Sequence, residues 1–149
     1  MYRETIRSTP QWTRGEIPGP HRDCVFVSAP GDDTDTTAND LNIARVLSFF
    51  SFSRSGKEYQ CALVHWFSTF GYEPDPDTGM WVVVPNYNGR GYRNASVIHV
   101  DSIVHGAHLS PIFDTSKLPG WLNYTQSLNY FCAFYINKYI DPHAFELLR

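Results

Sequence analysis

The sequence lacks the short motifs by which common enzymes are recognised. It has no Gly-x-Ser-x-Gly turn for a serine nucleophile, and the run NGRG at residues 88–91 is too short for a glycine loop that cradles phosphate. None of the three cysteines lies beside residues that activate a thiol. We therefore expect a protein that is not an enzyme.

An excess of positive charge is also missing. Twelve Lys and Arg against fifteen Asp and Glu give a formal net charge of −3, so no global basic field favours non-specific binding to nucleic acid. Apolar runs long enough to span a bilayer are absent, and membrane insertion is not expected. The few cysteines are far apart and odd in number, which is typical of reduced core residues in an intracellular protein: Cys24, Cys61 and Cys132.

Aromatic residues, by contrast, are abundant. The 149 residues include 4 Trp, 9 Tyr and 10 Phe, and 42% of the chain is hydrophobic. This composition is typical of a folded domain with a sizeable core and unlike that of a disordered chain. Either the rings build the core, or some of them form a surface that a partner covers.

Residues 43–67 predict the central element of the fold. Residues 45–52 and 59–67 are rich in aromatic and β-branched side chains, which favours two strands, and the polar residues between them include Gly56, which suits a tight turn. The segment CALVHWF at 61–67 is apolar on both of its faces. This strand is therefore expected in the centre of a closed or nearly closed sheet, covered on both sides.

Further strands are predicted where short apolar runs lie between turn-forming residues. These runs occupy residues 23–27, 80–84, 95–100 and 108–113. Between the last two, Asp101 and Ser102 favour a single helical turn through Val104.

A helix is predicted near the C-terminus. Thr125 is a suitable N-cap for residues 126–139, and residues 141–148 predict a second, short helix. Apolar side chains recur on one face of the first helix at the spacing of helical turns, at Leu128, Phe131, Cys132, Tyr135 and Tyr139. Its opposite face is also apolar, so this helix is expected to be buried on two sides.

The expected fold is mainly β, in the α+β class. It is a small barrel of five to six strands with a C-terminal α-helix. Residues 1–22 are predicted to form a partly flexible arm, residues 23–117 the β-barrel domain, and residues 118–149 a helical extension packed on the barrel.

Two groups of residues invite assignment to metal chemistry. The first contains a His-x-x-His spacing and an acid, at His99, Asp101, His105 and His108. The second is an acidic trio, Asp75, Asp77 and Asp101. Both are disfavoured, because the first group spans a strand and a turn, and two of the acids lie in a turn-rich loop where they are expected to cap turns. No metal and no cofactor is expected.

Aromatic and basic residues gather on two strands and in the loop of residues 86–94. Exposed rings and arginines are enriched at recognition surfaces, where they bind peptide tails or single-stranded nucleic acid by stacking and cation–π contact. The alternative for the tryptophans is a place in the core, where strand tryptophans usually lie. The candidate ligand-binding residues are Trp66, Trp81, Tyr87, Arg90, Tyr92 and Arg93.

Six stretches of the chain form a distinctive ordered set. They are DCVFV (23–27), CALVHWF (61–67), DPDTGMWVV (75–83), VIHVDSI (97–103), AHLSPIF (107–113) and AFYINKY (133–139). Together they resemble the C-terminal region of large transposase-like proteins of basidiomycete, mushroom-forming fungi, the Plavaka and the Kyakuja–Dileera–Zisupton elements. The resemblance runs in order from about Asp23 to Glu146.

This resemblance implies a transposon-derived protein of the fungal nucleus. It places the chain outside the RNase-H-like catalytic core of those transposases, whose metal-binding carboxylates have no counterpart here. The order of hairpin, loop and strands also resembles the chromatin-associated BAH domain. The implied function is a non-catalytic accessory interaction domain that binds a protein tail, chromatin or nucleic acid. Both a fragment of a larger transposase and a short stand-alone gene fit the pattern.

A second hypothesis is a homo-oligomerisation module. In it, the second apolar face of the helix predicted over residues 126–139 packs against another copy of the chain.

Overall fold

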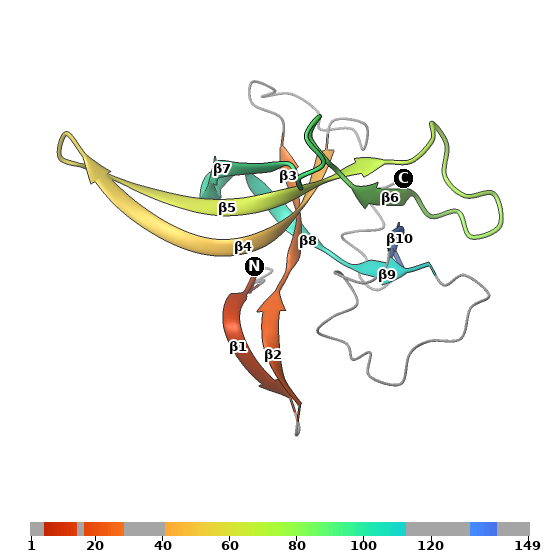
Figure 1. The fold of residues 1–149 in the computed structure, drawn as a ribbon, viewed down its shortest axis with the longest axis horizontal. Helices are drawn as coiled ribbons and strands as arrows, with labels where there is room; N and C mark the ends of the chain where they lie inside the picture. The colour runs from red at the N-terminus through yellow and green to blue at the C-terminus, as the bar shows by residue number, and fades with distance from the viewer. Residues whose placement is uncertain (1–4, 15–16, 29–40, 113–131, 140–149) are drawn as a thin grey trace.

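The computed structural model describes residues 5–14, 17–28, 41–112 and 132–139, and these ranges consist mainly of β-strands (Figure 1). The strands are β1 (Ser8–Arg14), β2 (Ile17–Arg22), β3 (Cys24–Ser28), β4 (Leu41–Arg54), β5 (Lys57–Thr69), β6 (Val82–Pro85), β7 (Ala95–His99), β8 (Ile103–Ala107), β9 (Leu109–Pro111) and β10 (Phe134–Ile136). Within these ranges, a turn of 3-10 helix, η2 (Val100–Ser102), connects β7 to β8.

Eight of these strands form one sheet that curls into a nearly closed barrel. Its order is β8-β3-β4-β5-β6-β10-β9, and β7 pairs with β5 outside this path. The end strands β8 and β9 are separated in the chain only by His108, whose carbonyl accepts a hydrogen bond from Asn137 N–H, directly after β10 (2.8 Å). The ends of the sheet therefore approach each other, and the prediction of a mainly β, barrel-like fold is confirmed.

β4 and β5 form the predicted hairpin. Ser55 and Gly56 connect them, both with positive φ (54° and 77°), a conformation that glycine adopts at little cost. The register shifts once, between Val46 and Ser48, where Leu47 is the additional residue of β4. β5 pairs with β4, β6 and β7, which confirms its central place.

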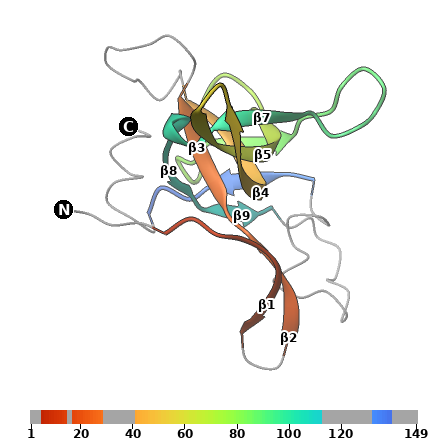
Figure 2. The ribbon, with the colours of Figure 1, turned by 90° about the vertical axis from the view of Figure 1, so that its left-hand side faces the viewer.

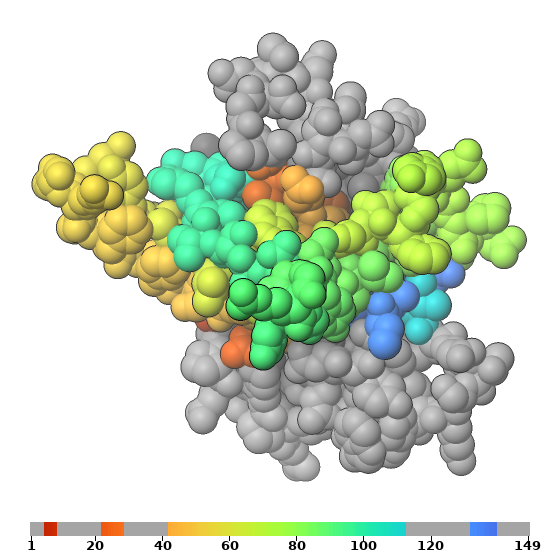
Figure 3. Space-filling view, turned by 45° about the horizontal axis from the view of Figure 1, so that its top comes forward, coloured from red at the N-terminus to blue at the C-terminus, as the bar shows by residue number. Residues whose placement is uncertain are grey.

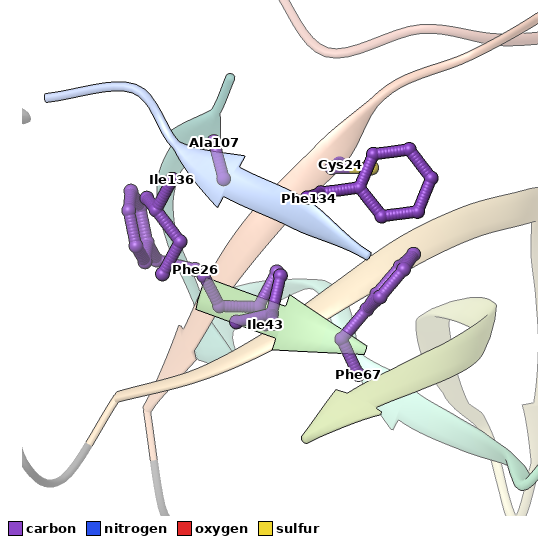
Figure 4. Close-up of a cluster of buried hydrophobic side chains, with 8 residues drawn as sticks. Cys24, Phe26, Ile43, Phe67, Ala107, Phe134 and Ile136 are labelled. Atoms are coloured by element: carbon purple, nitrogen blue, oxygen red, sulfur yellow. The ribbon is translucent and has the colours of Figure 1, made fainter. Parts of the chain in front are cut away.

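Buried side chains lie on both faces of the central strands, because successive residues of a strand point to opposite faces. The cluster inside the barrel combines six strands, as Figure 4 shows: Cys24, Phe26, Ile43, Phe67, Val83, Ala107, Phe134 and Ile136. In it, the rings of Phe67 and Phe134 meet edge to face, with centroids 5.9 Å apart. A second cluster covers the other face of β3, β4 and β5: Val25, Val27, Ala44, Val46, Ala62 and Val64.

The range predicted as an N-terminal arm contains a hairpin of its own. β1 pairs antiparallel with β2, and the two strands extend away from the barrel (Figure 2). At its base, Asp23 N–H donates to the Arg7 carbonyl (2.9 Å) and the Ser8 hydroxyl donates to the Leu47 carbonyl (2.6 Å). These bonds connect the start of the hairpin to β3 and β4.

The prediction of a helix over residues 126–139 is wrong for its C-terminal part. Phe134–Ile136 form strand β10, which lies between β6 and β9 and buries Phe134 and Ile136 inside the barrel. The strand forms because two neighbouring strand edges offer partners to its backbone N–H and C=O groups, which a short apolar segment cannot leave unpaired in a core. The sheet thus includes residues beyond 117. Residues 126–131 and 141–148 lie outside the described residues.

The other predicted strands are confirmed within a few residues of their bounds, as β3, β6, β7 and β9. The predicted helical turn begins earlier than expected, at Val100, with His99 as its N-cap. Ile103 and Val104 belong instead to β8, which pairs with β3. The sequence did not predict this strand, because IVHGA contains a glycine and a histidine that weaken the strand pattern.

Candidate functional site

A pocket of about 850 Å³ opens beside β5 and β7. Asn86 and Asn94 both line it, so the loop of residues 86–94 begins and ends at its rim. The other lining residues come from β3 to β7 and η2: Val27, Ser28, Asn42, Ile43, Trp66, Phe67, Ser68, Thr69, Val83, Ser96, Val97, Ile98, His99 and Ser102. Its volume falls within the usual range of ligand pockets, about 300–1,000 Å³.

Neutral hydrogen-bonding groups form one wall of this pocket. Asn94 Nδ2 donates to Asn86 Oδ1 (3.2 Å), and Asn86 Nδ2 donates in turn to the Ser68 hydroxyl. The Trp66 indole Nε1 donates to the Ser96 hydroxyl (2.9 Å). Among the described lining residues there is no Asp, Glu, Lys or Arg. The described lining therefore offers amide, hydroxyl and ring surfaces to a ligand, without a carboxylate, ammonium or guanidinium group.

The loop of residues 86–94 is a compact extension of the sheet. Asn86 N–H donates to the Trp66 carbonyl and Trp66 N–H donates to the Asn94 carbonyl, both at 3.0 Å. Within the loop, Asn88 N–H donates to the Tyr92 carbonyl (2.8 Å), and the Asn88 side chain accepts from the N–H of Tyr92 (3.2 Å). Figure 2 shows the loop, in green, extending away from the barrel before β7.

Arg93 anchors this loop to β5. Its guanidinium lies 5.1 Å from the centre of the Phe67 ring and 5.8 Å from the centre of the Tyr87 ring, and Nη2 donates to the Trp66 carbonyl (3.2 Å). Burial lowers the pKa of Arg93 below its usual value. The side chain is thus a cation in contact with two rings, and these contacts anchor the loop to β5.

The predicted site residues separate into two groups. Trp66 lines the pocket and packs against the second core cluster, whereas Trp81 packs against the cluster inside the barrel and does not line the pocket. Tyr87, Arg90 and Tyr92 are exposed, the two tyrosines by 59% and 71%. The exposed part of the loop therefore presents two rings and one cation outside the described lining of the pocket, and each tryptophan packs against a core cluster.

Sequence reasoning missed the polar wall of the pocket. Ser68 and Ser96 belong to strands whose apolar residues dominated the pattern, and Asn86 and Asn94 were included only as ends of a loop. The available signal was the pair of asparagines at both ends of one aromatic loop. Asparagine amides both donate and accept hydrogen bonds, so such a pair is suited to a site for a polar, neutral group.

The groups considered for metal chemistry have structural roles. His99 Nδ1 lies 3.3 Å from Asp101 Oδ2 and accepts from Asp101 N–H (3.1 Å), while His105 is buried in β8 and His108 is exposed. Within the described residues, no three His, Cys, Asp or Glu side chains gather in a way that could hold a metal ion.

Asp75 caps a turn, as predicted. Its Oδ1 accepts from Asp77 N–H (2.9 Å) and Thr78 N–H (3.0 Å), and these hydrogen bonds lower the pKa of the Asp75 carboxyl below its usual range. The Tyr135 hydroxyl reaches Asp75 Oδ2 at 3.5 Å. This contact connects the loop before β6 to β10.

One end of the barrel carries buried basic groups. Arg45 lies directly between Cys24 and His65 across three strands, and it is 4% exposed. Burial raises the pKa of the Cys24 thiol to about 12, so this thiol stays protonated near neutral pH. Burial and the neighbouring arginines, Arg93 first, lower the pKa of His65. These groups are ill suited to nucleophilic catalysis.

In comparisons with protein-family models, curated proteins and solved structures, nothing matches this chain. The described residues contain no helix of the length and apolar character needed to cross a membrane. The resemblance to fungal transposase-like proteins therefore remains a hypothesis that depends on the sequence stretches alone.

Proposed function

We propose that this chain is a non-catalytic accessory interaction domain, and that it binds an extended protein tail in the pocket beside the loop of residues 86–94. The observation that carries the proposal is the neutral wall formed by Asn86, Asn94, Ser68 and Ser96 at the base of an exposed aromatic loop. A peptide backbone presents one donor and one acceptor at each residue, which amide and hydroxyl groups can satisfy.

A protein tail fits this pocket better than a nucleic-acid backbone does. Binding to phosphates depends on Lys and Arg that neutralise their charge, and the described lining of the pocket has neither. Rings on the wall, including Trp66 and Phe67, offer apolar surface for an anchor side chain. Nucleic acid is therefore the second candidate partner.

The exposed part of the loop would extend the contact beyond the pocket. Tyr87 and Tyr92 offer amphipathic surface, and Arg90 adds an exposed cation that suits backbone carbonyls of the tail. The Tyr87 ring already contacts the Arg93 guanidinium. Tyr92 and Arg90 are thus the better candidates for direct recognition.

The sequence resemblance suggests where such a domain would act. If the chain derives from a Plavaka or Kyakuja–Dileera–Zisupton element, its partner belongs to the nucleus of a basidiomycete fungus, and a histone tail of chromatin is the natural candidate. In its more specific form, the proposal is that the domain is a BAH-like module, with which the barrel-like sheet is compatible. DNA, as part of the second candidate class of partner, would contact the basic residues of the loop and not the described lining of the pocket.

Fluorescence anisotropy tests the proposal, with labelled histone-tail peptides and a labelled single-stranded oligo(dT) as probes. We expect a peptide to bind, and the double variant Arg90→Ala/Tyr92→Ala to raise its Kd by about tenfold. Val97→Trp, which adds bulk at an exposed position of the lining, should also weaken binding. Tyr72→Ala is the control, because Tyr72 is 99% exposed and outside the pocket.

Two results would contradict the proposal. One is equal peptide affinity for the wild type and both site variants. The other is oligo(dT) binding in the absence of any peptide binding, which would favour a nucleic-acid partner instead.

A further inference from the structure

The distal half of the β4–β5 hairpin, residues 48–60, extends beyond the rest of the sheet. The pairing of β3 with β4 ends at Arg45, and the pairing of β7 with β5 begins at Cys61. Val46 and Leu47 still hydrogen-bond to Asp23 and Ser8, but beyond them no other described strand pairs with residues 48–60. In Figure 1 they form the long curved ribbon that leaves the barrel, and in Figure 3 their tip, in yellow, projects from the body.

This distal hairpin carries large exposed rings. Phe49, Phe50 and Phe52 are 38%, 40% and 46% exposed, and the Phe52 ring stacks on that of Tyr59 with centroids 5.2 Å apart. An isolated two-stranded ribbon is at best marginally stable in water, and exposed clusters of rings usually mark an interaction surface. The ribbon is therefore suited to a partner that adds strands to it.

At three residues of the distal part of β4, the backbone N–H and C=O groups point away from β5. Arg54 and Lys57 flank a two-residue turn and so form a hydrogen-bonded pair. Because pairs alternate along an antiparallel ladder, the N–H and C=O groups of residues 53, 51 and 49 then point away from β5. Among the described strands, none pairs with β4 at these residues.

We propose that a second copy of this chain pairs with this edge, antiparallel and two-fold symmetric about Ser51. In that register Ser51 pairs with Ser51 of the partner subunit, and Phe49 pairs with the partner's Ser53. It is the one register in which all three outward residues find outward partners, and it gives six backbone hydrogen bonds. The two hairpins become one four-stranded sheet.

The side chains are also compatible with this register. Phe50 lies opposite the partner's Phe52 in non-hydrogen-bonded pairs, where cross-strand rings approach most closely. Arg54 lies opposite the partner's Ser48, so no like charges face each other. The paired segment ends at Ser48, the residue after Leu47, whose carbonyl already accepts a hydrogen bond from the Ser8 hydroxyl.

The edge also lacks the usual protection against such pairing. Natural edge strands carry lysines, prolines or inward-pointing charges that prevent pairing with another chain. Residues 48–53, SFFSFS, contain none of these. A second copy suits this edge better than an unrelated strand because the same three residues complete the ladder on both sides. This surface is distinct from the pocket and from the helix considered for homo-oligomerisation above.

Sedimentation velocity over a range of concentrations, on the full chain, tests the proposal. We expect the wild type to dimerise, and Ser51→Lys to raise the dimer Kd by at least about tenfold, because two like charges would face each other on the axis. Gln60→Lys is the matched control: Gln60 lies directly across the hairpin from Ser51 on the opposite strand, so it should leave the dimer intact.

Charge reversal gives a stricter test. A mixture of Ser51→Lys and Ser51→Glu chains should form a heterodimer that neither variant forms alone as a homodimer. A second matched pair removes one N–H: Ser51→Pro should dissociate the dimer and Gln60→Pro should not, since proline is tolerated at edge positions whose N–H faces outward.

Three results would overturn the proposal. They are a wild type that stays monomeric at all concentrations, equal dimerisation of Ser51→Lys and wild type, and equal losses from the Ser51 and Gln60 substitutions. Peptide binding at the pocket is measured separately with Val97→Trp, which should leave the dimer unchanged, so failure of either proposal is distinguishable from failure of the other.

Discussion

The two halves of the β4–β5 hairpin both carry large apolar side chains but have opposite surroundings. In the half near the barrel, Phe67 and Val64 are buried, because β3, β6 and β7 flank the same two strands. In the distal half, Phe50 and Phe52 are substantially exposed. The difference shows that neighbouring strands, and not the apolar side chains of the hairpin itself, decide which part is core.

A second difference separates the distal hairpin from the two loops that leave the sheet. The loop of residues 86–94 is anchored by Arg93, and the loop before β6 is anchored by Asp75 and its contact with Tyr135. In the described structure the distal hairpin has its own strand pairing, the stacking of Phe52 on Tyr59 and the contact of the Lys57 ammonium with the Tyr59 ring. We therefore expect a substitution to lower the free energy of unfolding most where the side chain connects its segment to the barrel.

The largest expected effect separates the core inside the barrel from the distal hairpin. Phe26 is 1% exposed inside the barrel, and Phe26→Ala should lower the free energy of unfolding by about 3–5 kcal/mol, because it leaves a cavity that neighbours cannot fill. Phe52→Ala should cost less than about 1 kcal/mol in a monomer, since that ring is already half in water. Urea unfolding at low protein concentration measures both; equal losses would remove the distinction.

A smaller effect is expected at the anchor of the aromatic loop. Arg93→Ala should cost about 1–2 kcal/mol, because it removes a hydrogen bond to the Trp66 carbonyl and the contacts with two rings. Arg90→Ala should change stability very little, since Arg90 is exposed on the same loop. Thermal unfolding of both variants checks this; a larger loss for Arg90→Ala would show that the anchor is misassigned.

The smallest effect is expected at Asp75 and depends on pH. Its pKa is lower in the folded chain than in the unfolded chain, so the unfolded state binds more protons as the pH falls. The stabilisation is therefore present above the usual carboxyl pKa and is lost at lower pH. Asp75→Asn keeps an acceptor but removes the charge, so the small Tm difference from wild type should shrink from about pH 6 to about pH 2.

A constant Tm difference over this range would show that the Asp75 charge contributes nothing. Asp77→Asn is the matched control, because in the described contacts Asp77 contributes its backbone N–H and not its carboxylate to this turn.

The central part of the fold could be predicted because its signals are local. CALVHWF is apolar on both faces, and the Ser-Gly turn follows directly after a run of aromatic strand residues. AFYIN misled the prediction, because its apolar residues also fit a helical face. Its strand is formed by pairing with β6 and β9, which come from distant parts of the sequence.

That the loop of residues 86–94 is a binding site stays a prediction, whereas the contacts of its residues come from the fold. The aromatic and basic loop was found from composition, yet nothing local distinguishes Arg90 from Arg93. Only the fold places Phe67 and the Trp66 carbonyl beneath one of them. The pocket wall depends on side chains from β5 and β7 and on both ends of the loop, so no single stretch of sequence contains its pattern.

By itself, the sequence determined the β4–β5 hairpin with its tight turn and the strands β3, β6, β7 and β9, because side-chain alternation and turn chemistry act between residues that are close in the chain. The tertiary structure decided which rings are buried, which arginine is an anchor, where β10 inserts and which part of β4 has no further partner among the described strands. These depend on contacts between residues far apart in the sequence, which form only when the sheet curls into its barrel.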